Sequence, residues 1–191
     1  MIDARDYALL YLCGRLGPRR ISLGTLRWGS LVVEASAAVI AFHVKGDRYD
    51  RVLAPPDVLA VLATWHKELA VALGRPLRAE DAVFPPVGAK TRDIGPGSGA
   101  ALEPMTTSSI SYQVRHRFAH VGIVGPGFAA HALRATAATV AYENGATVEE
   151  IQAMLGHLNR PQTEAYIRRR LIRSAAARWV PGDGLDLPKS A

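Results

Sequence analysis

The residues of this chain whose types and spacing could do chemistry lie between positions 131 and 166. His131 and Arg134 are three positions apart, the spacing that places two side chains on one face of a helix. His157 follows a glycine that is typical of a helix end, and Tyr166 comes nine residues later. In a basic chain, a tyrosine hydroxyl grouped with a guanidinium and two imidazoles has the parts needed to attack a phosphodiester.

That chemistry requires a defined set of side chains. Tyrosine is a weak nucleophile at neutral pH because the pKa of its free hydroxyl is about 10. The attack therefore needs help with deprotonation and a target made electrophilic. Two guanidinium groups suit the charge that develops on the phosphate oxygens, and an acid on the opposite side must protonate the departing alcohol. The set is two Arg, one or two His, one Lys and one Tyr, and it needs no metal.

Two upstream residues complete the set. Arg19 begins the segment 19–28, in which apolar residues lead to a Leu followed two positions later by Trp, and Lys45 precedes Gly46 at a predicted turn. With His-x-x-Arg, Leu-Gly-His and the tyrosine at their observed intervals, these residues make the chain resemble the catalytic domain of the tyrosine recombinases, the phage integrase family. The resemblance extends over about residues 4–172.

The resemblance implies how the nucleophile and the proton donors act. Tyr166 would attack the scissile phosphate and form a 3′-phosphotyrosine link, releasing a free 5′-hydroxyl. Lys45 would protonate the leaving 5′-oxygen, and His131 would serve as the acid or base beside the tyrosine. Because the covalent link conserves the phosphodiester energy, strands could be exchanged and resealed without ATP.

The resemblance also assigns the groups that hold the phosphate. Arg19 and Arg134 would bind its non-bridging oxygens, and His157 would donate a hydrogen bond to one of them. No metal or cofactor is implied. Two residues near Arg19 differ from those usual in the family: Ser22 stands where Glu is frequent, and Pro18 stands where Leu is usual.

Composition favours one globular domain with an anionic partner. The chain has 191 residues, 49% of them hydrophobic, and a formal net charge of +6. Its single cysteine, Cys13, excludes an internal disulfide and is expected to be a buried core residue. Beyond the catalytic set, four basic residues are candidates for contacts with DNA: Arg20, Arg115, Arg117 and Arg168.

The surrounding sequence predicts an α+β fold, mainly α-helical with a small three-stranded antiparallel sheet. Alternation and turn residues predict strands at 31–33, 38–44 and 49–53. Residues 85–104 are expected to form a long loop. Helical periodicity and capping signals predict helices at 4–15, from 20 to 28, from 56 onward, and at 106–121, 128–143, 147–156 and from 161 onward.

We expect residues 1–173 to form the catalytic domain and residues 174–191 a tail, which by the resemblance docks on a neighbouring protomer. The N-terminal core-binding domain usual in the family is expected to be absent. No apolar run is long enough to span a bilayer, and no signal peptide is present, so a cytoplasmic, nucleoid-associated protein is expected. The implied partners are double-stranded DNA and other protomers in a DNA-bound tetrameric synapse.

Alternatives to a site-specific recombinase or integrase remain open at the level of sequence. A type IB topoisomerase uses a similar Arg, His, Lys and Tyr set, although the short interval between Leu-Gly-His and the tyrosine favours the recombinase. A non-cleaving DNA-binding regulator on the same fold would be expected to have lost at least one of the six residues. A protein-interaction module explains neither the charge nor the spacing.

Overall fold

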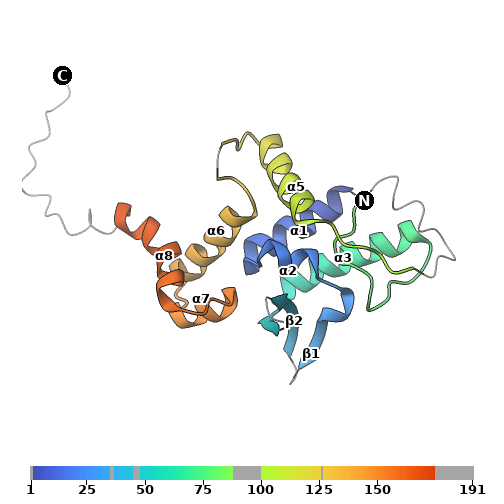
Figure 1. Cartoon of the computed structure of the whole chain (residues 1–191), viewed down its shortest axis with the longest axis horizontal. Helices are drawn as coiled ribbons and strands as arrows, with labels where there is room; N and C mark the ends of the chain where they lie inside the picture. The colour runs from blue at the N-terminus through green and yellow to red at the C-terminus, as the bar shows by residue number, and fades with distance from the viewer. Residues whose placement is uncertain (1, 35–36, 45–47, 88–99, 126, 175–191) are drawn as a thin grey trace, which may run out of the picture.

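The structure, a computed structural model, is mainly helical and contains one small sheet (Figure 1). It describes residues 2–34, 37–44, 48–87, 100–125 and 127–174, and the side chains of these residues except Glu34 and those after Ile167. Lys45, most of the predicted loop and all but the first residue of the predicted tail therefore lie outside the described residues. In the segments that are described, no helix combines the length and apolar character needed to cross a membrane.

The sheet is antiparallel with the strand order β1-β2-β3. Ile40 of the central strand lies opposite Leu31 on one side and Val52 on the other. The strands are β1 (Leu31–Glu34), β2 (Ala37–Val44) and β3 (Arg48–Leu53). The described helices are α1 (Ile2–Leu16), α2 (Arg20–Gly24), α3 (Pro56–Leu73), α5 (Thr107–His120), α6 (Ala130–Glu143), α7 (Val148–Leu155) and α8 (Arg160–Ser174). This arrangement confirms the predicted fold class and all three predicted strands.

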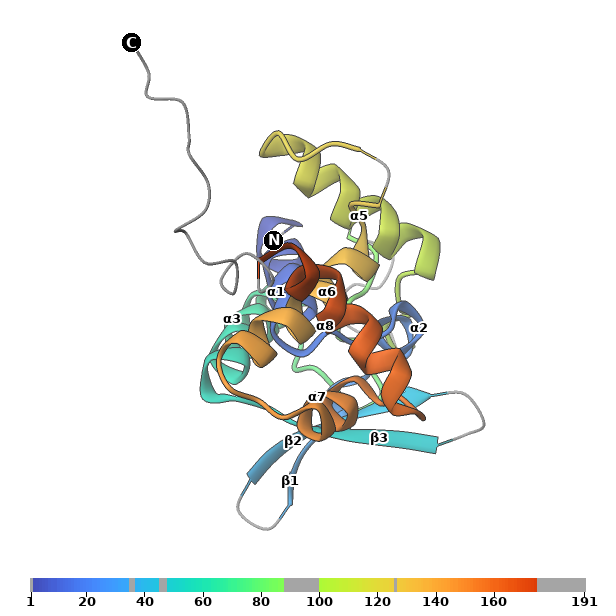
Figure 2. The same cartoon turned by 90° about the vertical axis from the view of Figure 1, so that its left-hand side faces the viewer.

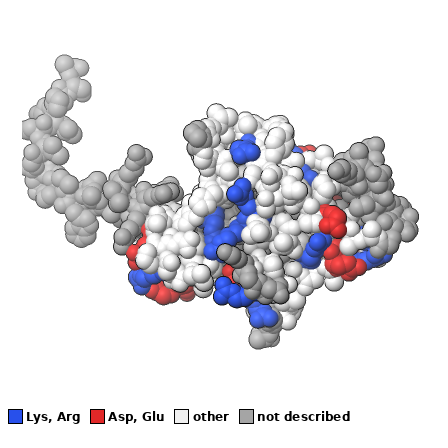
Figure 3. Space-filling model, in the orientation of Figure 1, with Lys and Arg blue, Asp and Glu red and all other residues white. Residues whose placement is uncertain are grey.

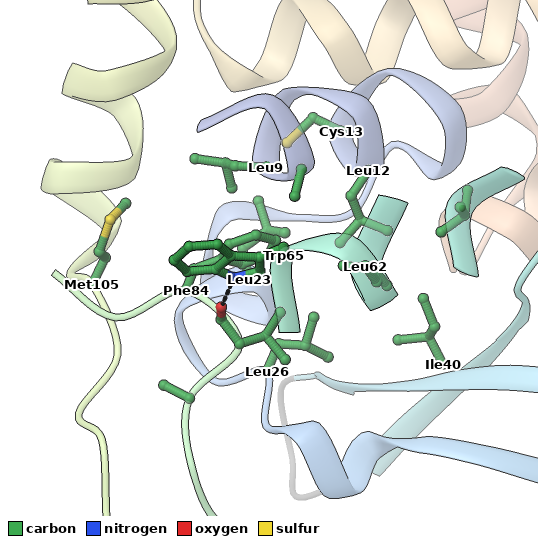
Figure 4. Packing of buried hydrophobic residues seen from close by; sticks show 14 of the residues in the cluster. Leu9, Leu12, Cys13, Leu23, Leu26, Ile40, Leu62, Trp65, Phe84 and Met105 are labelled. Atoms are coloured by element: carbon green, nitrogen blue, oxygen red, sulfur yellow. Dashed lines mark hydrogen bonds between the residues drawn. The ribbon is translucent and has the colours of Figure 1, made fainter. Parts of the chain in front are cut away.

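The larger of two hydrophobic cores joins α1, α2, α3 and the sheet (Figure 4). Trp65 lies in this core, and its indole N–H donates a 2.7 Å hydrogen bond to the carbonyl of Val83. Cys13 is buried in the same core, as predicted, and burial raises its pKa to about 12. The thiol therefore stays protonated at neutral pH and acts as a small apolar side chain.

A second, smaller core holds together the helices that carry the predicted chemistry. Ala138 of α6, Ile151 and Leu155 of α7, and Ile167 of α8 are its buried members. Figure 2 shows these three helices as one group, with α7 beside the sheet, and α7 contacts β3. The packing fixes α8 against α6, which sets the distance between their polar side chains.

The capping signals predicted around α7 are confirmed. The Thr147 side chain accepts from the N–H of Glu150, and the Glu150 carboxylate accepts from the N–H of Thr147, so both ends of a capping box are made. The helix ends at Gly156, which adopts the left-handed conformation with φ 60°. A glycine suits that conformation because it has no Cβ to clash with the backbone.

One predicted helix is shorter than expected. The sequence predicts helix through Trp28, but α2 ends at Gly24 and a short 3-10 turn covers Trp28–Ser30. The backbone N–H of Trp28 donates to the carbonyl of Asp81 at 3.0 Å, and Arg27 forms a bridge with Ala82. These backbone groups bond to residues more than fifty positions away instead of forming helical hydrogen bonds with near neighbours. The prediction of a helix extending to Trp28 is therefore wrong.

Candidate active site

Two arginines meet at the turn that follows α7. Arg134, from α6, donates a 2.6 Å hydrogen bond from Nη2 to the carbonyl of Leu155. Arg19, which immediately precedes α2, donates from Nη2 to the carbonyl of the next residue, Gly156, at 2.7 Å. The other terminal nitrogen of Arg134 donates to the carbonyl of Gly17. Two guanidinium groups from distant parts of the chain are thus held by consecutive carbonyls of one turn.

The two arginines differ in burial. Arg134 is 5% exposed, and its pKa is lowered to about 10, first by burial and then by repulsion from Arg19, while Tyr166 and Asp50 act in the opposite direction. It remains charged at neutral pH. The Arg19 side chain is about one-third exposed, and its Nη1 lies 3.9 Å from a carboxylate oxygen of Asp50 on β3. The pair therefore presents one buried and one accessible positive charge.

The close packing of this turn leads to a prediction for Gly156→Ala. A Cβ built on Gly156 would lie 2.0 Å from an oxygen of Asp50, and the left-handed backbone disfavours a side chain independently. We expect the substitution to lower the free energy of unfolding by at least about 1–2 kcal/mol, the cost of the conformation alone. Urea denaturation measures this change.

Gly14→Ala provides the matched control for that measurement. Gly14 lies within α1, and no atom lies within 4 Å of the Cβ that the substitution would add. Alanine in a helix interior is favoured over glycine by up to about 1 kcal/mol, so this variant should be at least as stable as the unmutated chain. Equal losses for the two variants would contradict the assigned role of the turn.

His157 is the next residue along the turn, and its ring is enclosed by protein. It is 5% exposed, and its Nδ1 lies 2.9 Å from Oγ1 of Thr163. The ring stacks on that of Tyr166, with the planes 18° apart and the centroids separated by 5.4 Å. Burial lowers its pKa to about 4, and the positive charges of Arg134 and Arg19 act in the same direction, so the ring is neutral at pH 7.

The tyrosine hydroxyl lies beside the other predicted histidine. The hydroxyl oxygen of Tyr166, on α8, is 3.1 Å from Nε2 of His131, on α6. The His131 side chain is exposed and that of Tyr166 is partly exposed. This distance is within hydrogen-bond reach, as a general base requires, and a substrate can reach the hydroxyl from solvent.

Arg19 and His157 border an open cleft of about 770 Å³ between the sheet and α7. Arg19, Arg48 and Asp50 line one wall, whereas Glu149 and His157 come from the other. Figure 3 shows basic side chains gathered near the middle of one face of the molecule. The cleft combines exposed positive charge with enough open volume to admit part of a polymer backbone.

The structure thus brings together five of the six predicted catalytic residues. The sixth, Lys45, lies outside the described residues, but its neighbour Val44 and the first residue of β3, Arg48, both line the cleft. Sequence reasoning missed Asp50 and Thr163. The signal for Asp50 was its position two residues after Arg48, which places both side chains on the same face of a strand.

Arg117, one of the four predicted DNA contacts, is already paired within the protein. Its Nε lies 2.7 Å from the buried carboxylate of Asp6, and its Nη2 lies 2.7 Å from Asp3. Asp6 also accepts from Arg5, which is buried beside it. Because the guanidinium joins α5 to α1, we do not carry Arg117 into the proposed DNA surface. Its partners lie more than a hundred positions away, where sequence reasoning could not find them.

The other three candidates remain predictions. Arg115 is exposed on α5, and Arg20 is exposed at the start of α2, where its Nη1 donates to the hydroxyl of Ser111 at 2.8 Å. Arg168 is on α8, two residues after the tyrosine, and its side chain is not among those described. The first two therefore place accessible positive charge on α2, which reaches the cleft through Ile21, and on α5, which packs against α2.

Comparison with known proteins identifies relatives of this chain. A sequence model of the phage integrase family matches residues 1–171. The tyrosine recombinase XerC of Caldanaerobacter subterraneus subsp. tengcongensis is 33% identical over 66 residues, which are 34% of this chain and 19% of the relative.

Solved structures share the fold. XerH site-specific recombinase bound to a palindromic difH substrate aligns with a TM-score of 0.70 and 21% identity, over 93% of this chain and 46% of that one. XerA recombinase aligns with a TM-score of 0.68 and 23% identity, over 95% and 59% of the two chains. A lambda integrase dimer bound to a core site aligns with a TM-score of 0.61 and 16% identity, over 87% and 43%.

The chain therefore spans about half the length of the solved proteins that it matches. At sequence identities this low, structural similarity shows a shared fold and nothing further. The match of the family sequence model extends over nearly all of the chain and includes each of the six predicted catalytic positions. The chain belongs to the phage integrase family.

Proposed function

We propose that this chain is a site-specific DNA recombinase that cleaves and rejoins strands through a 3′-phosphotyrosine intermediate. One observation carries the proposal: the Tyr166 hydroxyl lies 3.1 Å from a histidine nitrogen, in the site where two arginines converge on the turn after α7. A tyrosine placed for packing alone would need neither a proton acceptor nor two adjacent cations. The arrangement fits transfer of a phosphoryl group better than binding of DNA alone.

The first step of the proposed reaction forms the covalent link. His131 accepts the proton of the Tyr166 hydroxyl as the phenolic oxygen forms a bond to phosphorus. The bond from phosphorus to the 5′-oxygen breaks, and Lys45 gives that oxygen a proton. Rejoining reverses these steps, with a 5′-hydroxyl as the nucleophile and tyrosine as the leaving group.

The rate of that step depends on how well the site stabilises the negative charge that develops on the phosphate. The non-bridging oxygens become more negative in the transition state, and the two guanidinium groups and an imidazole N–H offer donors to them. Arg134 is already fixed by two backbone carbonyls, so little reorganisation is needed when the phosphate arrives. Arg19 keeps part of its surface free in the cleft, which suits direct contact with the incoming anion.

The proposed substrate is double-stranded DNA, bound by several protomers that assemble into a tetrameric synapse. The net charge of +6 and the exposed arginines Arg20 and Arg115 support an anionic polymer as the partner. The related XerH recombinase bound to its difH substrate and the lambda integrase dimer bound to a core site support DNA and further protomers as partners. An enzyme of this kind would work at the nucleoid.

The proposal is tested with suicide substrates, nicked DNA duplexes that trap the covalent intermediate. The sequence of the target site need not be known in advance. Duplexes with a randomised core and a nick just 3′ of the varied positions let the short 5′-hydroxyl fragment diffuse away after cleavage. Protein-linked strands are captured in detergent, sequenced and enriched over several rounds. We expect one family of sequences to accumulate as adducts joined through the 3′-phosphate. No adduct at any round would contradict the proposal, and relaxation of supercoiled plasmid without strand exchange would favour a topoisomerase.

Binding to the recovered duplex should depend steeply on salt. If about 4–6 phosphates are neutralised by arginine and lysine, log K should fall with log salt at a slope of about −4 to −5. Fluorescence anisotropy at several salt concentrations measures this slope. Arg115→Gln should reduce it by about one if that exposed side chain meets a phosphate. A flat response would show that the basic surface does not face DNA.

Removal of the segment after Ser174 tests the proposed role of residues 174–191. We expect the shortened chain to melt like the full chain, because the described members of both hydrophobic cores all lie before the cut. Assembly on DNA with two recovered sites should be impaired, since the removed segment is proposed to dock on a neighbouring protomer. Native gel shifts compare the complexes, and equal multimer formation by the two chains would count against docking.

A further inference from the structure

His157 and Thr163 form a buried pair whose hydrogen-bonding capacity can be counted. The two residues are 5% and 0% exposed, and Nδ1 of the ring lies 2.9 Å from the threonine hydroxyl. The other ring nitrogen, Nε2, is also buried and has no hydrogen-bond partner among the residues that the structure describes. Buried polar atoms are nearly always paired, so an unpaired nitrogen in a catalytic cluster calls for an explanation.

Two arrangements of protons are possible for a neutral ring. If Nδ1 carried the proton and donated to the hydroxyl oxygen, the hydroxyl hydrogen would have no acceptor within the described part of the chain, and Nε2 would have an unpaired lone pair. If the hydroxyl of Thr163 donates to Nδ1, both atoms of the contact are satisfied and Nε2 carries the proton. The second arrangement leaves one unpaired group instead of two. That group is the Nε2–H of His157, which is a hydrogen-bond donor.

Other threonines of the chain show that this contact is a specific one. Thr64 and Thr139 lie within helices and donate to the backbone carbonyl four residues earlier, the usual outcome for this side chain. The hydroxyl of Thr163 instead bonds to the histidine ring, its one hydrogen bond among the described segments. Its proton is therefore available to the imidazole.

We propose that Thr163 is a positioning residue that sets the tautomer of His157, so that Nε2 carries the proton and offers a donor to a phosphate oxygen. The proposal deepens the recombinase function and rests on it for the identity of the acceptor. Thr163 precedes Tyr166 by three residues, so both side chains lie on one face of α8. The helix that supplies the nucleophile thus also fixes the proton of the neighbouring imidazole.

The electrostatic surroundings of the ring agree with this assignment. Burial and the charges of Arg134 and Arg19 hold the pKa of His157 near 4, so a doubly protonated ring is not the form present at pH 7. A neutral imidazole can donate from one nitrogen alone. Which nitrogen donates is then decided by the threonine hydroxyl, since the phosphate oxygens can only accept.

The tautomer is measured directly and without DNA. Nitrogen-15 is incorporated into the six histidines of the full chain, and long-range proton–nitrogen correlation spectra are recorded at pH 7. The signals of His157 are assigned by their loss in His157→Gln. We expect the pattern of a ring protonated at Nε2. A pattern of protonation at Nδ1 in the unmutated protein overturns the proposal, whatever the fate of the recombinase assignment.

Thr163→Val and Thr163→Ser provide the matched pair. Valine keeps the branched shape and removes the hydroxyl, so we expect a mixture of tautomers and slower single-turnover cleavage of the recovered suicide duplex. Loss of one well-placed transition-state donor costs about 10²–10³-fold, and partial loss of the correct tautomer should cost about tenfold or more. Serine keeps the hydroxyl and should restore both the spectrum and most of the rate.

The combined variant separates a role through His157 from general damage. In the His157→Gln background, Thr163→Val should slow cleavage by no more than about twofold, because the ring it acts on is gone. An unchanged tautomer together with an unchanged rate in Thr163→Val refutes the proposal. If the unmutated chain forms no adduct at all, the recombinase function fails, while the spectra still report whether threonine sets the tautomer.

Discussion

Replacing Tyr166 by Phe should abolish the covalent DNA adduct and leave DNA binding almost unchanged. The substitution removes one oxygen, the atom that forms the bond to phosphorus in the proposed reaction. The phenyl ring can keep its stacking on His157, so the helix that carries it should not shift. Denaturing gels of the suicide reaction measure the adduct, and fluorescence anisotropy with the same duplex measures binding.

Tyr142→Phe is the matched control for this result. Tyr142 packs on the same small core as Tyr166, and its loss of a hydroxyl tests whether any tyrosine in this region affects cleavage. Normal adduct formation by this control and none by Tyr166→Phe would locate the nucleophile. An adduct of normal yield from Tyr166→Phe would instead place the nucleophile on another residue and remove the basis of the proposed mechanism.

Local signals in the sequence predicted much of the fold correctly. The capping box at Thr147 and the glycine at position 156 determine where α7 begins and ends, because each acts on backbone groups within a few residues. The spacing of His131 and Arg134 placed them on one helix for the same reason. Such features depend on neighbours in sequence, so a single chain is enough to predict them.

Contacts between segments that are distant in sequence could not be predicted from such local signals. Arg19 reaches a carbonyl 137 positions away, and nothing near it in sequence indicates that partner. Pairing of Arg117 with Asp6 and of Arg19 with Asp50 likewise depends on which elements the folded chain places side by side. The family resemblance supplied the identity of the predicted catalytic residues, whereas the hydrogen bonds that hold them in place are visible only in the fold.

The two arginines also differ in what their removal would test. Arg134 is buried and bonded to two carbonyls that join α6 to the turn before α2 and to the end of α7, so its loss would disturb the fold as well as the site. Arg19 is partly exposed and makes one backbone bond. Arg19→Ala is therefore the cleaner probe of phosphate binding, and it serves as the reference variant for the test of the proposed acid.

Lys45→Ala should slow cleavage of ordinary DNA by about 10²–10⁴-fold, the usual contribution of a general acid. The proposed role of Lys45 is to protonate the departing 5′-oxygen, which as an alkoxide is a poor leaving group. When sulfur replaces that bridging oxygen, the departing thiolate needs no proton. Single-turnover rates of adduct formation are compared on the two otherwise identical suicide duplexes.

On the sulfur-containing duplex, Lys45→Ala should approach the rate of the unmutated chain, whereas Arg19→Ala should stay slow on both substrates. In the proposed mechanism the Arg19 guanidinium stabilises charge on the non-bridging oxygens, and replacing the bridging oxygen by sulfur does not remove that need. Arg48→Ala is the matched control, because it removes a positive charge that is three positions away in sequence and lines the cleft. If Lys45→Ala and Arg48→Ala behave alike and neither is rescued by sulfur, Lys45 holds DNA in place and the proton comes from another group.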